Sequence, residues 1–218
     1  GFCFSGNCSK PYFPAKEIDT EFMEQQNVIY RHLPFRGLTE QTVKFYNILT
    51  KVVDDVPTAW GFVYPNEAIK SRLIQEKKFK AEGPISDSGL FGRDKFNAGS
   101  KKSVTITEGE TDAPSLYQAL GGNSACVSVQ SSTTALRDCK HDYEWVNSFD
   151  KIILAFDNDE PGQKAARQVA TLFDFNKVYH VKFDKFKDAN EFLTNDSIRE
   201  LAEIWSNAKK YTPDHIIN

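Results

Sequence analysis

Three clusters of acidic residues, each just after a short apolar run, constrain the fold of this chain most. They span residues 108–112, 157–160 and 187–191. A parallel strand that ends in an acid places a functional group at its carboxyl end, and open α/β sheets bind their ligands at that edge. We therefore expect a mainly parallel sheet on which the acids of the three clusters meet.

The second half of the chain alternates between patterns typical of strands and of helices. The expected strands are apolar on both faces, as buried parallel strands are, and cover residues 104–107, 125–129, 152–156 and 178–183. Helices are expected at 112–120, after the hydroxyl-rich residues 131–134, after Pro161, and at 189–192 and 198–208. The sequence thus predicts an α/β domain over residues 101–208, with helices flanking the sheet.

Residues 15–100 are expected to form a smaller α+β subdomain. Thr39 is a candidate N-cap for a helix over residues 41–49, and residues 60–75 have the pattern of a β-hairpin. The return strand and the turn after it carry basic side chains that could cradle phosphates or form a solvated edge: Lys70, Arg72, Lys77, Lys78 and Lys80. Residues 90–100 are rich in turn formers and are expected to be a loop or linker.

The two ends differ from the rest of the chain. Residues 1–14 hold Cys3 and Cys8, which could be half of a zinc knuckle or two free thiols, since a structural zinc site needs four ligands. Residues 209–218 lose the helical periodicity and are expected to begin a linker. With no initiator Met, the chain is expected to be a piece of a longer protein.

Composition excludes two classes of function. The 27 Lys and Arg residues are balanced by 30 Asp and Glu residues, so the chain lacks an overall basic footprint for tight nucleic-acid binding. No apolar run approaches the roughly 20 residues that span a bilayer, and no membrane association is expected. Phosphate binding must therefore come from local basic patches.

The acids themselves point to metal chemistry. Asp157 and Asp159 are two residues apart, so both can point the same way, and Glu108 ends a neighbouring strand. Carboxylates gathered in this way repel one another without a cation, and oxygen ligands favour Mg²⁺ or Mn²⁺. The alternative is that such acids only cap helices, which we expect for Asp112 and Glu160. The sequence contains no phosphate-binding P-loop and no Gly-x-Ser-x-Gly elbow.

The pair Glu108-Gly109 with Asp157-Asn-Asp159 resembles the TOPRIM signature of primases, topoisomerases and some nucleases. The resemblance then narrows to the primase half of the T-odd-type phage primase–helicases. It covers the chain from about residue 30 onward, through Phe35-Arg-Gly-Leu-Thr-Glu40, Lys77-Lys-Phe-Lys80, Leu90-Phe-Gly92, Asn97-Ala-Gly99, Thr107-Glu-Gly-Glu-Thr-Asp112, Asp157-Asn-Asp-Glu-Pro-Gly162, Lys187-Asp-Ala-Asn-Glu191 and Trp205-Ser-Asn-Ala208.

This resemblance implies a DNA primase that makes short RNA primers from NTPs on a single-stranded DNA template. Glu108, Asp157 and Asp159 would hold two Mg²⁺ or Mn²⁺ ions. Glu108 is also the implied general base, and Asp188 would support a metal or its water. Triphosphate or template phosphates would be neutralised by four basic residues: Arg72, Lys77, Lys80 and Arg93.

The family also implies partner modules outside this chain. An N-terminal zinc ribbon would use Cys3 and Cys8 as its second pair and bind Zn²⁺ only with an upstream pair, and a hexameric helicase would follow the linker. The Cys spacing and a loop at 130–134 without glycines depart from the family pattern. The implied location is the cytoplasm of an infected bacterial host.

Two alternatives stay open at this point. A TOPRIM nuclease or topoisomerase fragment would use the same acids to cut DNA. A non-catalytic DNA-binding lobe of a replicative helicase would need no acids at all, so the presence of Glu108, Asp157 and Asp159 argues against it.

Overall fold

The computed structural model describes residues 27–76 and 78–212, and within them the chain forms two five-stranded sheets. The second sheet, in the order β10-β9-β8-β6-β7, is parallel except for its edge strand β10. Its strands are β6 (Ser103–Thr107), β7 (Ala125–Ser128), β8 (Lys151–Ala155), β9 (Val178–His180) and β10 (Lys209–Lys210). The α/β class and the mainly parallel sheet expected from the sequence are confirmed.

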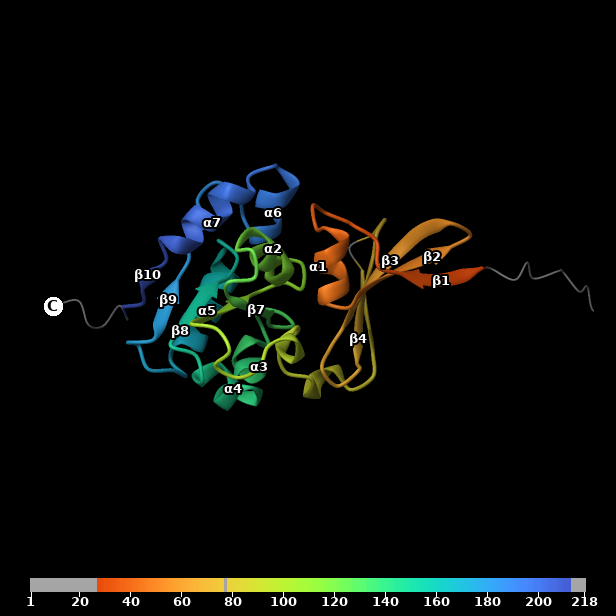
Figure 1. Ribbon diagram of the computed structural model, residues 1–218. Helices are drawn as coiled ribbons and strands as arrows, with labels where there is room; N and C mark the ends of the chain where they lie inside the picture. Colours follow the sequence, from red (N-terminus) through yellow and green to blue (C-terminus); the bar gives the residue numbers. More distant parts are fainter. Residues whose placement is uncertain (1–26, 77, 213–218) are drawn as a thin grey trace, which may run out of the picture.

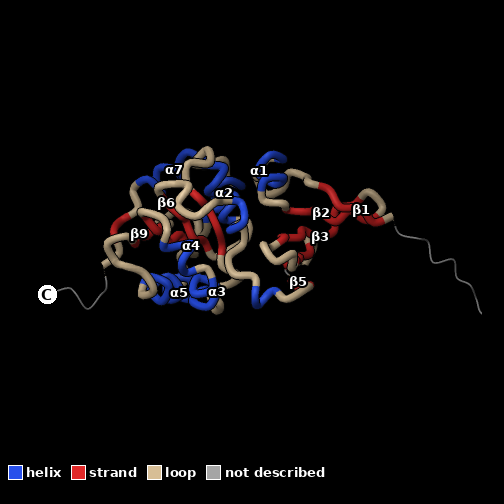
Figure 2. Tube along the Cα trace, turned by 60° about the horizontal axis from the view of Figure 1, so that its bottom comes forward, coloured by secondary structure: helices blue, strands red, loops and turns tan. Residues whose placement is uncertain are grey.

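Helices cover both faces of this sheet (Figures 1 and 2). On one face lie α2 (Asp112–Ala119), α6 (Ala189–Thr194) and α7 (Ile198–Ser206). On the other lie α3 (Ala135–His141), α4 (Tyr143–Asn147) and α5 (Glu160–Ala170). β6 is buried along its whole length because it lies between β8 and β7 and helices cover both faces of the sheet.

The first sheet is antiparallel, with its strands in sequence order. They are β1 (Val28–Arg31), β2 (Ile48–Val53), β3 (Val56–Val63), β4 (Ile69–Leu73) and β5 (Phe79–Glu82), and α1 (Glu40–Phe45) precedes β2. Figure 1 shows α1 between this sheet and the parallel one, with β1 at the end of the molecule away from the parallel sheet. The first sheet therefore projects as a separate lobe beside the α/β lobe.

One hydrophobic core joins the two sheets. Leu90 and Phe91 are fully buried, and Phe91 forms a β-bridge with Ser128 of the parallel sheet. The hydroxyl of Tyr46, just after α1, donates to the carbonyl oxygen of Cys126 in β7 at 2.8 Å. Residues 90–100, expected to be a loop or linker, include the short 3₁₀ turn Arg93–Lys95 and contribute Leu90, Phe91 and Phe96 to the core that joins the two lobes.

Several expectations about the first lobe need correction. The helix expected over residues 41–49 ends at Phe45, and Ile48 already begins β2. Asn47 has a positive φ of 53°, which ends the helical turn, and the β-branched run that follows favours a strand. The hairpin is present as β3 and β4, whereas the strands beside it, β2 and β5, and the edge strand β1 were not expected.

Other expectations meet the limits of the described residues. β9 is shorter than expected and stops at His180. Cys3 and Cys8, the expected zinc pair, lie outside the described residues, as does the tail from residue 213. Among helices of the described chain, none combines the length and apolarity that a membrane span requires.

Candidate active site

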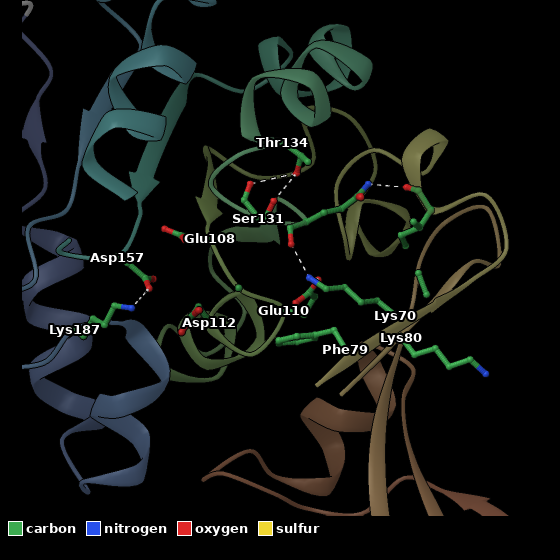
Figure 3. A pocket seen from close by; sticks show the side chains of 14 residues that line it. Lys70, Phe79, Lys80, Glu108, Glu110, Asp112, Ser131, Thr134, Asp157 and Lys187 are labelled. Atoms are coloured by element: carbon green, nitrogen blue, oxygen red, sulfur yellow. Dashed lines mark hydrogen bonds and ion pairs between the residues drawn. The ribbon is translucent and has the colours of Figure 1, made fainter. Parts of the chain in front are cut away.

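The acidic residues meet at the carboxyl ends of two adjacent strands. β6 and β8 are parallel neighbours in which Thr107 pairs with Ala155, so Glu108 and Asp157 follow the strands at the same edge of the sheet. A cavity of about 580 Å³ opens there. Figure 3 shows its two walls: the acids on the α/β lobe, and Lys70 and Phe79 on the first sheet. Of the acids that the sequence predicts to gather, Glu108 and Asp157 line this cavity, whereas Asp159 and Asp188 are not among its lining residues.

Lys187 links the two aspartates of the second cluster. Its Nζ lies 3.1 Å from Oδ2 of Asp157 and 3.0 Å from Oδ2 of Asp159. Asp159 is also the N-cap of α5, and its Oδ1 accepts the N–H of Gly162 at 2.9 Å. That backbone hydrogen bond, with help from Lys187, lowers the pKa of Asp159, whereas burial raises the pKa of Asp157 despite the lysine.

Glu108 is only partly compensated, by a hydrogen bond with Ser132 and by the charge of Lys187. Its Oε2 is buried and has no hydrogen-bond partner among the described residues. Burial, followed by the negative charge of Asp157, raises the pKa of Glu108 to about 7. A buried oxygen without a donor is costly, and such atoms in native proteins call for an explanation such as an ion.

Two glycines leave room for these carboxylates. A Cβ on Gly162 would lie 2.6 Å from the carbonyl oxygen of Asp157 and 2.7 Å from Oε2 of Glu108. A Cβ on Gly109 would lie 2.5 Å from Oδ2 of Asp112. Side chains larger than hydrogen at these positions would push the acids apart.

The third cluster begins α6 and ties the two lobes together. Asp188 is the N-cap, and its Oδ1 accepts the N–H of Glu191 at 2.8 Å, which accounts for one of its oxygens. The buried Asn190 donates to the carbonyl oxygen of Arg36 and accepts from the Nε of the same residue. Asp188 is near enough to Asp157 for its charge to raise the pKa of that residue, while the asparagine of its motif anchors the Arg36 turn.

Asp112 has a different role from the expected helix cap. Thr111 is the N-cap of α2, and Oδ1 of Asp112 accepts the N–H of Asn190 at 2.9 Å. Burial, and then repulsion by Asp188 and Asp157, holds the pKa of Asp112 well above its usual range. Asp112 lines the cavity, and its Oδ2 lies next to Gly109.

Glu110, which sequence reasoning left without a role, holds the first sheet against the acidic loop. Its Oε1 accepts the hydroxyl of the buried Tyr64 at 2.7 Å and the ammonium of Lys70 at 2.6 Å. Lys70 Nζ also donates to the carbonyl oxygen of Gln130, in the loop after β7, at 2.6 Å. The one sequence signal for a role of Glu110 was its place as the second Glu of the Glu-Gly-Glu motif.

The predicted phosphate-binding residues are dispersed. Arg72 lies on β4 between two aromatic rings, and Lys80 borders the cavity but is paired with Glu82 and points away from the acids (Figure 3). Arg93 lies in another cavity, where its Nε is 3.6 Å from Oδ1 of Asp142. Lys77 lies outside the described residues. The structure thus brings Arg72 and Lys80 to this part of the molecule and leaves Arg93 away from the acids.

The carboxylate oxygens of Glu108, Asp157 and Asp159 are the donors available for a divalent cation at this site. Within residues 27–76 and 78–212, no three acidic, histidine or cysteine side chains are already arranged as metal ligands. The ammonium of Lys187, however, occupies the position between Asp157 and Asp159 where positive charge is needed, and Glu108 offers a free oxygen. An all-carboxylate donor set of this kind fits Mg²⁺ or Mn²⁺.

Comparison with known proteins finds similar chains. A family model described as Toprim-like matches residues 105–193. The chain is 29% identical over 194 residues to a DNA helicase/primase of Enterobacteria phage T3, covering 87% of this chain and 34% of the relative. The chain thus spans about a third of the length of that relative.

Two solved structures extend the likeness over most of the chain. The primase fragment of the bacteriophage T7 primase-helicase has 31% identity and a TM-score of 0.71, covering 82% of this chain and 75% of that one. Primase domains bound to an RNA/DNA hybrid and dTTP, from a complex with the T7 lagging-strand DNA polymerase, have 30% identity and a TM-score of 0.70, covering 85% and 95%. The chain belongs to the family of primase domains found in T7-type phage primase–helicases.

Proposed function

We propose that this chain is the RNA-polymerising part of a DNA primase and joins ribonucleotides on a single-stranded DNA template during phage DNA replication. The observation that carries the proposal is the set of acids at the ends of β6 and β8, with Oε2 of Glu108 left without a hydrogen-bond partner among the described residues. Its relatives support it, since a T7 relative is named a primase fragment and another is bound to an RNA/DNA hybrid.

Glu108, Asp157 and Asp159 are the proposed ligands of Mg²⁺ or Mn²⁺, with Asp188 in support. A divalent cation held there would act as a Lewis acid toward the triphosphate and lower the pKa of the attacking hydroxyl. Oδ1 of Asp159 accepts the N–H of Gly162, which fixes this carboxylate at the start of α5, and its Oδ2 faces the ammonium of Lys187. Lys187 would yield its place between the aspartates, because it is half exposed and free to turn outward.

Glu108 is also the proposed acceptor of the proton from the primer 3′-hydroxyl. A carboxyl group with a pKa of about 7 can take up and release a proton near neutral pH. The opposite wall supplies the positive charge, with Lys70 held toward the cavity by Glu110 and Gln130. Cations on that wall would offset the charge of NTP and template phosphates.

The partners of this activity are proposed on the same basis. They are NTPs, a single-stranded DNA template, and a zinc ribbon and helicase elsewhere in the parent protein, whose place of action would be the cytoplasm of the infected cell. The curated T3 relative is named a helicase/primase, which supports the helicase partner. Zn²⁺ would require a further cysteine pair to complete Cys3 and Cys8.

The test is synthesis of labelled oligoribonucleotide from NTPs on single-stranded DNA, with a supplied dinucleotide to replace the initiating function of the missing modules. We expect extension with Mg²⁺ or Mn²⁺, its loss on chelation, and its loss in Asp157→Asn and Glu108→Gln. Glu200→Gln is the matched acid-to-amide control, because Glu200 lies on α7, pairs with Lys185 and does not line the cavity. Metal-dependent nicking without extension would replace the proposal by the nuclease alternative. Unfolding of both acid variants by circular dichroism would make these acids structural.

A further inference from the structure

Phe79, which lines the wall of the cavity opposite the acids, continues into a row of three side chains on the first sheet. Arg72 of β4 pairs with Trp60 of β3 and with Phe79 of β5. Residues directly opposite in antiparallel strands project from the same face, so the three side chains lie side by side. The guanidinium carbon is 5.9 Å from the centroid of each ring. The row is therefore a cation held between two aromatic rings.

Arg72 has no anion in direct contact. Its Nε is buried without a hydrogen-bond partner, and among the described residues it has no ion pair within 4.0 Å. The positive charge of Arg36 repels the guanidinium, and the negative charges of Asp188 and Glu110 attract it less strongly, from beyond ion-pair distance. A partly buried guanidinium with an unused donor fork is well suited to a phosphate, which it can bind through two hydrogen bonds.

Phe79 is the open ring of the row. Trp60 is covered by Phe35, which stacks on it at a centroid distance of 4.4 Å. Phe79, in contrast, is 50% exposed although it lines the cavity. Figure 3 shows its ring reaching from β5 toward the acidic wall, with Lys70 beside it at 5.1 Å. An exposed aromatic ring in a charged cavity is a surface on which a planar group can stack.

We propose that Arg72 and Phe79 together bind one nucleotide unit, with the base stacked on Phe79 and its phosphate on Arg72. The assignment deepens the proposed primase function and rests on it. Aromatic rings accept any base because every base has a π-face, which suits a protein that must copy varied sequence. The acidic wall would repel a phosphate in the absence of metal, so the phosphate belongs on the basic wall.

The bound unit can come from two sources, a template strand or an incoming NTP. The experiment therefore uses two probes: a short single-stranded DNA with one 2-aminopurine, and 2-aminopurine riboside triphosphate. Stacking quenches the fluorescence of this base, and titration gives the affinity without any catalytic step. Both titrations use the whole chain with chelator present, so that metal binding by the acids does not contribute.

Phe79→Leu is the main variant, because it removes the ring and keeps an apolar side chain. We expect it to lose the quenching and to bind one of the two probes roughly 5- to 150-fold more weakly. Phe79→Trp should retain both signals, and Arg72→Gln should weaken binding and lower the salt dependence by about one phosphate contact. Tyr30→Leu is the matched control, since Tyr30 is a 61% exposed aromatic on β1, at the other edge of the same sheet.

The outcomes separate this inference from the proposed function. Quenching lost in Phe79→Leu and kept in Phe79→Trp supports the nucleotide site, and the probe affected identifies its source. Equal binding by wild type and Phe79→Leu, equal losses in both Phe79 variants, or no binding of either probe by wild type would overturn it. If Phe79→Leu binds normally while wild type extends primers with metal, only this inference fails. If stacking on Phe79 is present but no RNA is made, the proposed function fails and the site stands.

Discussion

Replacement of Lys70 by Met tests the contact that joins the first sheet to the acidic loop. The ammonium of Lys70 lies 2.6 Å from Oε1 of Glu110, and the side chains are only 18% and 6% exposed. Lys70→Met keeps the length of the aliphatic stem and removes the charge. Glu110 then remains buried. Lys70 and Tyr64 both donate to its Oε1 in the wild type, and in the variant only the Tyr64 hydroxyl is left.

The expected loss follows from the burial of the pair. Removing one partner of a buried ion pair costs about 3–5 kcal/mol, because the other charge stays buried and unpaired. The residual exposure of Lys70 and the Tyr64 hydrogen bond reduce this, so we expect Lys70→Met to lower the free energy of unfolding by about 2–3 kcal/mol. The double change Lys70→Met with Glu110→Gln should lower it by only about 1 kcal/mol, because no uncompensated charge remains.

The assay is urea unfolding of wild type, both single variants and the double variant, which gives the coupling energy as a double-mutant cycle. The loss of the Gln130 carbonyl contact occurs in both Lys70→Met proteins and cancels from the cycle. Lys80→Met is the control, since the Lys80–Glu82 pair on the neighbouring strand is 76% and 57% exposed. Its effect should stay within about 0.5 kcal/mol.

A Lys70→Met protein that is as stable as Lys80→Met would refute the reasoning, because Glu110 would then be solvated rather than buried. A double variant as unstable as the sum of the singles would also refute it. In that case the two side chains would act separately, and the contact between the lobes would depend on the shared apolar core alone.

Further predictions concern the carboxylates. The pKa of Glu108 is raised from 4.5 to about 7, so the folded state holds this proton more tightly than the unfolded state and wild-type stability should fall as pH rises between these values. Glu108→Gln should be more stable than wild type by up to about 2 kcal/mol at pH 8 with chelator present, and should lose that advantage at pH 4.5, as measured by urea unfolding. Added Mg²⁺ should raise the thermal midpoint of wild type more than that of Glu108→Gln, and EDTA should reverse the shift; equal shifts would remove Glu108 from the ligand set. Gly162→Ala should cost about 1–3 kcal/mol, because its Cβ would meet Asp157 and Glu108, and should depress primer extension beyond what the stability loss explains; a Gly162→Ala protein with normal stability and activity would show that α5 can shift freely.

The sequence by itself determined the α/β lobe and the acidic site. Strand periodicity is local, and parallel strands meet at their carboxyl ends, so the position of Glu108 after one apolar run and of Asp157 and Asp159 after another is enough to bring them to one edge. The secondary structure of the first lobe was harder to predict from the sequence. The helix at residues 41–49 was extended too far, because Tyr46 and Leu49 keep helical spacing although Asn47 turns the chain into β2.

Only the tertiary structure decided which charges compensate which. Lys187 reaches the two aspartates from the loop before α6, and Lys70 meets Glu110 from a different sheet, 40 residues away in sequence. Arg72 and Phe79 become neighbours through the pairing of β4 with β5. Arg93, which the sequence did not distinguish from Arg72, instead forms an ion pair with Asp142. Electrostatic and stacking partners are set by distances of a few ångströms between distant segments, and no local pattern in the chain encodes those distances.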